Sequence, residues 1–276
     1  MVAPNLMSDL DGRYRGRDQK IHQLVKDNQY TVFSLWDTYR GNHPLFTLIQ
    51  QERTTQFIRT FLRQFDEGGD LPVWELAACE TECMIGYHSV SVISDAYMKG
   101  LDGKTKVAGM SYDAKKALND MHVTANINEL GKQTYANNGY LSSSDEPESV
   151  SKTLEYAYDD FCIAEMAAAL GNDEMAKTYR KRSFSFVNLF DPNTKFMRAR
   201  RGVEAERLLC SGPGRVGQAL EIVHAFNGRS LAKKPFQLLP AVAPVDVVHG
   251  PRIGISKATP RFKLEWLAGK QRQQLR

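Results

Sequence analysis

Cysteine is scarce in this sequence of 276 residues, and no long apolar run occurs in it. The four cysteines, at positions 79, 83, 162 and 210, are too few for the disulfide framework that stabilises small secreted domains. No apolar run reaches the ~18–20 residues of a membrane-spanning helix, so we expect no membrane span. The first residues, MVAPNLMSDLDGRYRGRD, lack the apolar core of a secretory signal, so no signal is predicted there.

Tyrosine is absent after residue 200, although the sequence contains 11 tyrosines. Residues 201–276 hold six of the 11 prolines and 13 Lys and Arg against 5 Asp and Glu, a net charge of +8. The first 200 residues carry a net charge of −4. Pieces of the tail such as LLPAVAPVDVV show neither helical nor strand periodicity. We therefore expect a divergent, poorly structured basic tail, produced by a frameshift or an unrelated terminal exon, with a genuine basic linker as the alternative.

Cys79 and Cys83 are four residues apart, so on a helix they would share a face, with His88 about one turn further. A structural metal site needs four ligands at a recognised spacing, and these three residues do not provide them. We favour two small core residues and predict no metal ligand.

Apolar residues recur at helical spacing through most of the first 200 residues. Phe57, Ile58, Phe61, Leu62 and Phe65 mark the buried face of one helix that ends at Gly68 and Gly69. Further helices are predicted over about 79–99, 111–122, 149–170 and 172–189, the last capped by Asn172 or Asp173. The segment DLPVWEL is expected to be extended, because Pro72 disfavours helix before it. The pattern predicts an all-α domain of helical hairpins.

Two pairs of tryptophan and acid lie near the predicted helix ends. Trp36 precedes Asp37 in SLWDTYR, and Trp74 precedes Glu75 in LPVWELAACET. Carboxylates that accept hydrogen bonds from hydroxyls, beside an aromatic ring that stacks on a sugar face, are typical of carbohydrate sites. Structural roles stay open for each of them: Asp37 as a cap, Trp74 as core, Glu75 as a solvated or ion-paired acid, and His88 as a satisfied core histidine.

Several long blocks of the sequence match a known family in order and spacing. They are PNLMSDLDGRYRGRD, YTVFSLWDTYRGNHPLFTL, GGDLPVWELAACETECMIGYHSVSVISDAYMKG, ESVSKTLEYAYDDFCIAEMAAALG and NLFDPNTKFMRAR. They resemble glycoside hydrolase family 92 over about residues 4–200. The resemblance implies an all-α fold, a partial (α/α)6 toroid of the six-hairpin glycosidase type. It further implies that residues 1–30 lead in from a missing N-terminal β-sandwich, that 31–200 form part of the catalytic barrel, and that 201–276 are the poorly structured tail.

The resemblance also implies an activity, that of calcium-dependent exo-α-mannosidases. These remove terminal mannose from N-glycans and mannans with inversion and are secreted, periplasmic or on the cell surface. Inversion needs two carboxyl groups separated widely enough to admit a water molecule. The family blocks that carry them, E-G/A-N-x-W-Q-Y and G-N-D/E-D-x-G-Q, and a linking H-G-N-E-P block are not matched here. We therefore assign no catalytic residue and no calcium ligand, and expect a truncated chain without activity.

The resemblance assigns sugar contacts to two residues of this sequence. Asp37 resembles the aspartate that hydrogen-bonds mannose hydroxyls, and Trp74 resembles the tryptophan that packs on the sugar. Trp36, Glu75 and His88 lie in the same blocks and form a second group of candidates. The expected partners are mannose-containing glycans, without nucleic acid. The alternatives are a non-catalytic mannose-binding fragment, a protein that interacts through its basic tail, and another six-hairpin glycosidase.

Overall fold

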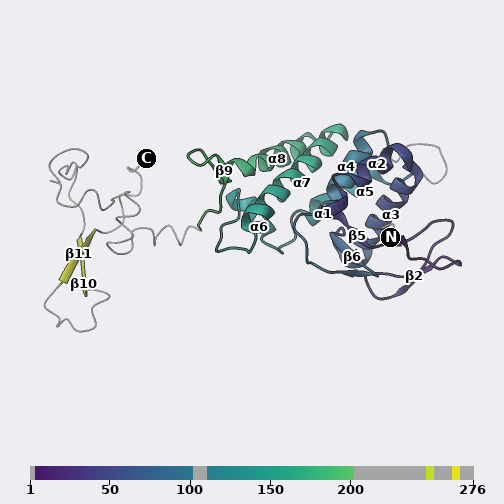
Figure 1. Ribbon diagram of the computed structural model, residues 1–276, viewed down its shortest axis with the longest axis horizontal. Coiled ribbons are helices and arrows are strands. Elements are labelled where there is room, and N and C mark those ends of the chain that lie inside the picture. The colour runs from purple at the N-terminus through teal and green to yellow at the C-terminus, as the bar shows by residue number, and fades with distance from the viewer. Residues whose placement is uncertain (1–3, 102–110, 202–246, 252–262, 268–276) are drawn as a thin grey trace. The chain divides into compact units, whose positions relative to one another are not determined.

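The computed structural model describes residues 4–101 and 111–201, together with two strands at 247–251 and 263–267. These residues fall into two units, Met1–Ser211 and Gly212–Arg276, each described by itself. The described part of the first unit is built mainly of helices (Figure 1). Its helices are α1 (Leu35–Thr38), α2 (Asn42–Ile49), α3 (Gln51–Gly68), α4 (Ser89–Met98), α5 (Ala114–Thr124), α6 (Lys132–Asn138), α7 (Ser149–Ala169), α8 (Asp173–Ser183) and the 3-10 helix η1 (Phe184–Leu189).

Helix α3 confirms the apolar pattern that predicts it. Phe57, Ile58 and Phe61 are almost completely buried, and the rings of Phe57 and Phe61 meet Phe33 edge to face. The helix ends where Gly69 adopts a left-handed conformation (φ 91°), and the Gly69 N–H donates to the carbonyl of Phe65 at 2.7 Å. Only glycine adopts that conformation without a steric penalty, which explains why the helix stops there.

Helices α7 and α8 form a helical hairpin and lie side by side in Figure 1. The helix predicted over 149–170 is confirmed as α7, and the predicted cap is Asn172, whose side chain accepts from the N–H of Met175. Helix α8 is shorter than expected, because the chain tightens into η1 after Ser183. On its other side α7 packs against α4 and α5. No helix among the described residues has the length and apolarity needed to cross a membrane.

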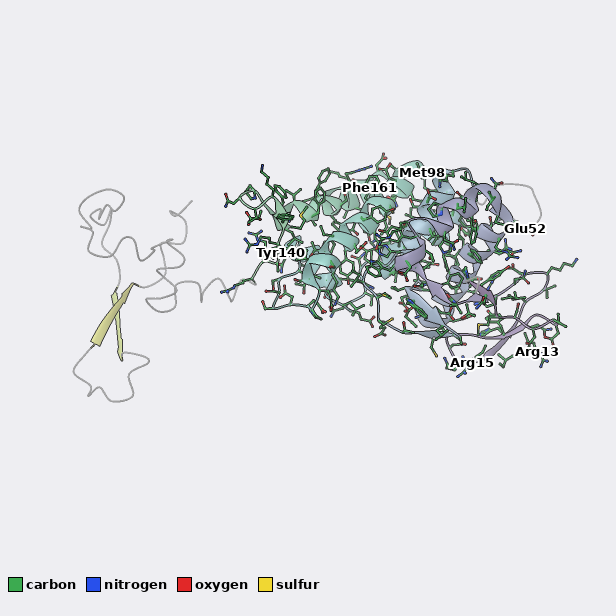
Figure 2. All side chains as sticks on the ribbon, in the orientation of Figure 1. Arg13, Arg15, Glu52, Met98, Tyr140 and Phe161 are labelled. Atoms are coloured by element: carbon green, nitrogen blue, oxygen red, sulfur yellow. The ribbon has the colours of Figure 1, made fainter. Side chains whose placement is uncertain are left out.

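The strands are short and hold the N-terminal segment to the helices. The pairs are antiparallel: β1 (Asn5–Leu6) with β4 (Tyr30–Thr31), β2 (Arg13–Arg15) with β3 (Ile21–Gln23), β5 (Phe33–Ser34) with β6 (Trp74–Leu76), β6 with β7 (Cys79–Glu80), and β8 (Phe190–Asp191) with β9 (Phe196–Met197). On β2, Arg13 and Arg15 are exposed (Figure 2). Tyr14 between them is buried, as the period of two requires. Tyr14 donates from its hydroxyl to Glu67 of α3 at 2.7 Å. The predicted lead-in is therefore folded against α3.

The helix predicted over 79–99 is wrong in its first half, because α4 begins only at Ser89. Ala77 and Ala78 have positive φ angles, and they turn the chain between β6 and β7. The Glu80 carboxylate accepts from backbone N–H groups of Val73, Trp74 and Thr81 at 2.8–3.0 Å, which competes with helix formation. Cys79 and Cys83 consequently do not share a helix face.

The prediction that these two cysteines are core residues is also wrong. Both thiols are free and exposed, whereas Cys162 on α7 is buried. Leu76 of the same hairpin is exposed as well, although Ala78 in its turn is buried.

A buried charged group centred on Asp160 joins α6, α7 and α8 to the loop that precedes α4. The Asp160 carboxylate accepts from the hydroxyls of Tyr87 (2.8 Å) and Tyr135 (2.9 Å) and from Nε of Arg182 (2.9 Å). Asp160 has no exposed surface. Burial raises the pKa of Asp160 to about 6, although the positive charge of Arg182 and the three hydrogen bonds oppose the shift. Asp160 is therefore ionised at neutral pH and depends on Arg182 to compensate its charge.

In the second unit the structure describes one strand pair, β10 (Val247–Pro251) with β11 (Lys263–Leu267), in antiparallel register. The rest of the tail, which the sequence predicts to be poorly structured, lies outside the described residues.

Candidate functional site

Asp37 lies on the exposed surface of a short helix that directly follows a buried strand. β5 ends at Ser34, and α1 begins at the fully buried Leu35. The Ser34 hydroxyl donates to the Asp37 carboxylate, which fixes the position of this acid. Asp37 remains exposed, so its carboxylate is accessible to a ligand in solvent.

The strand pairing brings Trp74 to the same place. Ser34 of β5 is the register partner of Trp74 of β6, so one residue contacts both sugar-contact candidates. Trp74 is half-buried, and its backbone N–H donates to Glu80 at 2.9 Å. Asp37 and Trp74, which are far apart in the sequence, therefore each neighbour Ser34.

Glu75 lies on the opposite side of β6 from Trp74, because successive side chains alternate. It has no exposed surface and accepts from the Thr31 hydroxyl at 3.0 Å and the N–H of Ala78 at 2.6 Å. Burial raises the pKa of Glu75. In this position Glu75 stabilises the turn that follows β6. Glu75 was predicted as a sugar contact, but no atom of its side chain is exposed to a ligand.

Trp36 and His88 meet at a glutamate that the sequence analysis did not select. Glu155 of α7 accepts from the Trp36 indole N–H at 3.0 Å and from the Tyr39 hydroxyl at 3.5 Å. His88 Nε2 lies 3.3 Å from Glu155 Oε2, without a directed hydrogen bond, while Nδ1 lies 2.9 Å from Asp159 Oδ1. We call these five residues, Trp36, Tyr39, His88, Glu155 and Asp159, the Glu155 cluster.

His88 is a buried cation at the centre of this cluster. Burial disfavours its charge, but the carboxylates of Asp159 and Glu155 outweigh burial and raise the pKa of His88 to about 9. Its ring stacks on Tyr39 with centroids 4.1 Å apart. Gly86 leaves room for this ring, because a Cβ at Gly86 would lie 2.3 Å from His88 Nε2. His88 is thus a buried histidine that is ion-paired with Asp159 and Glu155, while its Nε2 makes no directed hydrogen bond.

One sequence signal could have revealed Glu155 and Asp159. They are four residues apart in LEYAYDD, and residues at that spacing share one face of a helix. The adjacent pair Asp159 and Asp160 is more conspicuous, yet its members point to different partners: Asp159 to His88 and Asp160 to Arg182.

Similarity to known proteins decides the family. The model of the glycosyl hydrolase family 92 catalytic domain matches residues 1–205. The chain belongs to this family. Two solved family 92 mannosidases of Bacteroides thetaiotaomicron are similar to it. One is an α-mannosidase with 42% identity and a TM-score of 0.67, over 73% of this chain and 26% of that one. The other is an inverting mannosidase with 31% identity and a TM-score of 0.65, over 72% and 27%.

These matches confirm the predicted all-α, (α/α)6-type fold of the family 92 segment. The first of these mannosidases has also been solved in complex with mannoimidazole. This chain spans only about a quarter of the length of either enzyme.

The tail has relatives of a different kind. The methylpurine-DNA glycosylase model matches residues 186–271. A protein of Nitrosospira multiformis named as a 3-methyladenine DNA glycosylase is 63% identical over 62 residues, which is 22% of this chain and 32% of that protein. A Rhizobium meliloti protein of the same name is 59% identical over 63 residues, or 22% and 34%. Such identity is not expected of an out-of-frame translation, so it argues against the frameshift hypothesis.

Calcium is implied by the family 92 resemblance, and the described residues do not fit it. Among residues 4–101 and 111–201, no three or more His, Cys, Asp or Glu side chains form a group that could hold a metal ion. The carboxylates of the Glu155 cluster are already compensated by His88. We therefore derive no step of a reaction through calcium.

Proposed function

We propose that the family 92 segment of this chain is the mannose-contacting part of an inverting exo-α-mannosidase. Asp37 is proposed to accept hydrogen bonds from mannose hydroxyls, and Trp74 to pack on the sugar face. The observation that carries the proposal is the exposed Asp37 carboxylate, which Ser34 joins to the strand position of Trp74. The mannosidase solved with mannoimidazole, 42% identical over the same segment, supports mannose as the ligand.

Hydrolysis with inversion would require an acid and a base on opposite sides of the glycosidic bond. No carboxylate of the described residues is assigned to either role. We propose that this chain binds a terminal mannose without cleaving it. We also propose that the enzyme acts outside the cytoplasm, because glycoprotein glycans are displayed there.

We expect Asp37→Ala to weaken binding of mannoimidazole by about tenfold to a hundredfold, because hydrogen bonds to a charged acceptor contribute about 1.5–3 kcal/mol. Isothermal titration calorimetry of the full chain measures the effect, with a glucose-configured imidazole as the test of specificity. The matched control is Asp173→Ala, which removes another exposed aspartate in the first turn of a helix. Equal affinity of the wild type and Asp37→Ala would contradict the proposal, as would measurable cleavage of 4-nitrophenyl α-mannoside by the wild type.

A second candidate function concerns residues 201–276. The methylpurine-DNA glycosylase match and the net charge of +8 favour binding of this segment to DNA. This candidate departs from the sequence-based expectation of no nucleic-acid partner. The chain spans only about a third of the length of the curated relatives, so base excision itself is not proposed.

The DNA-binding candidate is tested by fluorescence anisotropy with a labelled 20-base-pair duplex. Reversing two charges, Lys233→Glu with Lys234→Glu, is expected to weaken binding by about tenfold and to reduce its salt dependence, because fewer counterions are released. The control is Lys177→Glu with Lys181→Glu, two exposed lysines of α8. Loss of affinity in the control alone, or no binding at 50 mM salt, would exclude this function.

A further inference from the structure

We propose that Asp159, His88 and Glu155 act as a positioning chain that fixes Trp36 and Tyr39 beside the sugar-contact residue Asp37. The inference rests on the proposed function, because it assigns residues to the same site. It adds Glu155, Asp159 and Tyr39 to that site as positioning residues that do not themselves contact the sugar.

The positioning chain ends at the Trp36 side chain. The Trp36 indole N–H donates to Glu155 Oε1 at 3.0 Å across 119 residues of sequence. An indole has one donor and no acceptor, so this bond selects one orientation of the ring. Trp36 immediately precedes Asp37 on α1, a helix of four residues that is too short to be rigid by itself. Fixing the Trp36 ring therefore restrains the backbone of α1, from which Asp37 projects, while the Ser34 hydroxyl holds the Asp37 carboxylate itself.

The other end of the positioning chain, Asp159, is buried on α7. Asp159 accepts from the Tyr87 N–H at 2.7 Å and from His88 Nδ1 at 2.9 Å, and neither Asp159 nor His88 has any exposed surface. These two contacts fix the plane of the imidazole. His88 then places its second nitrogen 3.3 Å from Glu155, whose side chain is 18% exposed. The fixed geometry thus extends from a buried helix face to the partly buried Glu155 carboxylate.

The groups around His88 balance its charge. Glu155 and Asp159 face it from α7, Tyr39 stacks on it from the end of α1, and the Tyr158 ring lies 6.4 Å away. Arg40 adds a second positive charge, with its guanidinium 4.6 Å from the Tyr39 ring centroid and 3.9 Å from Glu155. Two carboxylates are therefore matched by two cations.

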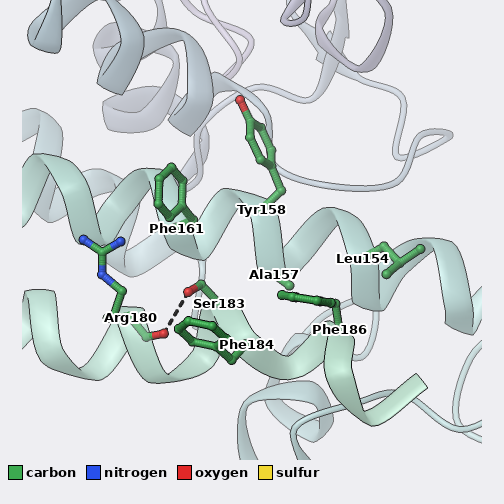
Figure 3. Close-up of a pocket in the computed structure, with 8 residues that line it drawn as sticks. All are labelled: Leu154, Ala157, Tyr158, Phe161, Arg180, Ser183, Phe184 and Phe186. Carbon is green, nitrogen blue, oxygen red and sulfur yellow. Dashed lines mark hydrogen bonds between the residues drawn. The ribbon is translucent and has the colours of Figure 1, made fainter. Parts of the chain in front are cut away.

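Packing alone does not require the buried charges of His88, Glu155 and Asp159. Replacing a buried ionic cluster by apolar residues of similar volume is often neutral or stabilising, so charges in this position indicate a need for directed bonds. Gly86 supports the same conclusion, because any side chain there would displace the His88 ring. The apolar pocket of about 390 Å³ on another side of α7, lined in part by Phe161, Phe184 and Phe186 (Figure 3), contains no comparable set of charges.

The first test observes Trp36 directly and needs no sugar. In nitrogen-15 NMR of the full chain, the indole signal of Trp36 is assigned by its disappearance in Trp36→Phe, which separates it from Trp74 and Trp266. We expect this signal to shift in one step between pH 8 and 10, because deprotonation of His88 leaves Asp159 without its countercharge and Glu155 with Arg40 alone. In His88→Gln the step should disappear. A step that persists in His88→Gln, or the lack of any step in the wild type, would overturn the proposal.

The second test measures affinity for mannoimidazole. We expect Glu155→Ala to weaken binding about tenfold, and Glu155→Gln to restore most of the loss, because the amide oxygen still accepts the indole N–H. Glu165→Gln, an exposed acid on the same helix, is the control and should bind like the wild type. Wild-type affinity in Glu155→Ala would refute the positioning role. If the wild type binds no mannoimidazole, the proposed function fails, whereas the indole measurement still decides whether the positioning chain exists.

Discussion

Replacing Asp160 by alanine is expected to lower the free energy of unfolding by about 3–5 kcal/mol, because it leaves Arg182 as an uncompensated charge in a largely buried position. The side chain of Arg182 is only 12% exposed, and the hydroxyls of Tyr87 and Tyr135 would lose the Asp160 carboxylate as an acceptor as well. Urea unfolding followed by circular dichroism at pH 7.5 measures the change. A loss of this size is a large part of the stability of an ordinary domain.

Two further variants separate the charge effect from packing. Asp95→Ala removes an exposed aspartate that pairs with Lys99 on the same helix, and it should cost no more than about 1 kcal/mol. Asp160→Ala combined with Arg182→Met removes both charges and should recover part of the loss. If Asp160→Ala costs as little as Asp95→Ala, the buried group does not hold the helices together.

Acid is expected to destabilise the protein through His43, whose ring is buried on α2 between Phe46 and Phe57. Neither ring nitrogen has a hydrogen-bond partner among the described residues, and burial lowers the pKa of His43 to about 4 from 6.5. Between these values the unfolded chain binds a proton that the folded chain does not, so stability is retained above pH 6.5 and lost as the pH falls towards 4. The full difference corresponds to ~3 kcal/mol.

The contribution of His43 is isolated by comparing urea unfolding at pH 7.5 and pH 4.5 in the wild type and in His43→Phe. The variant keeps an aromatic ring and cannot take up a proton, so it should lose ~2–3 kcal/mol less than the wild type over this interval. His22→Gln, a histidine on the exposed β2–β3 hairpin, should follow the wild type closely. The same acid-induced loss in wild type and His43→Phe would show that His43 is not responsible.

The long helices could be predicted because their signal is local. Phe57, Ile58 and Phe61 repeat at the spacing of one helix face, and Gly69 ends that helix by its own conformational freedom. The segment 79–88 could not be predicted in this way. Its course depends on hydrogen bonds that the Glu80 carboxylate accepts from the N–H groups of Val73 and Trp74, and these bonds leave no helical or strand periodicity in the sequence.

The candidate site was recognised from the family blocks in part. Trp36 and His88 both reach Glu155 of α7, whereas Asp37 and Trp74 each neighbour Ser34 of β5. Glu155 was missed, because its partners are 67 and 119 residues away in sequence. Its role exists only once α7 packs against α4 and α1.

The sequence by itself determined the helical class, the family and the change of character near residue 200, since composition, period and long blocks of residues are properties of the chain alone. Tertiary structure decided which polar residues act together. It made Glu75 a buried support, exposed Cys79 and Cys83, and gave His88 its charge by placing two carboxylates beside it. The physical reason is that burial and Coulomb interaction depend on distance in space, and residues far apart along the chain acquire that proximity only by folding.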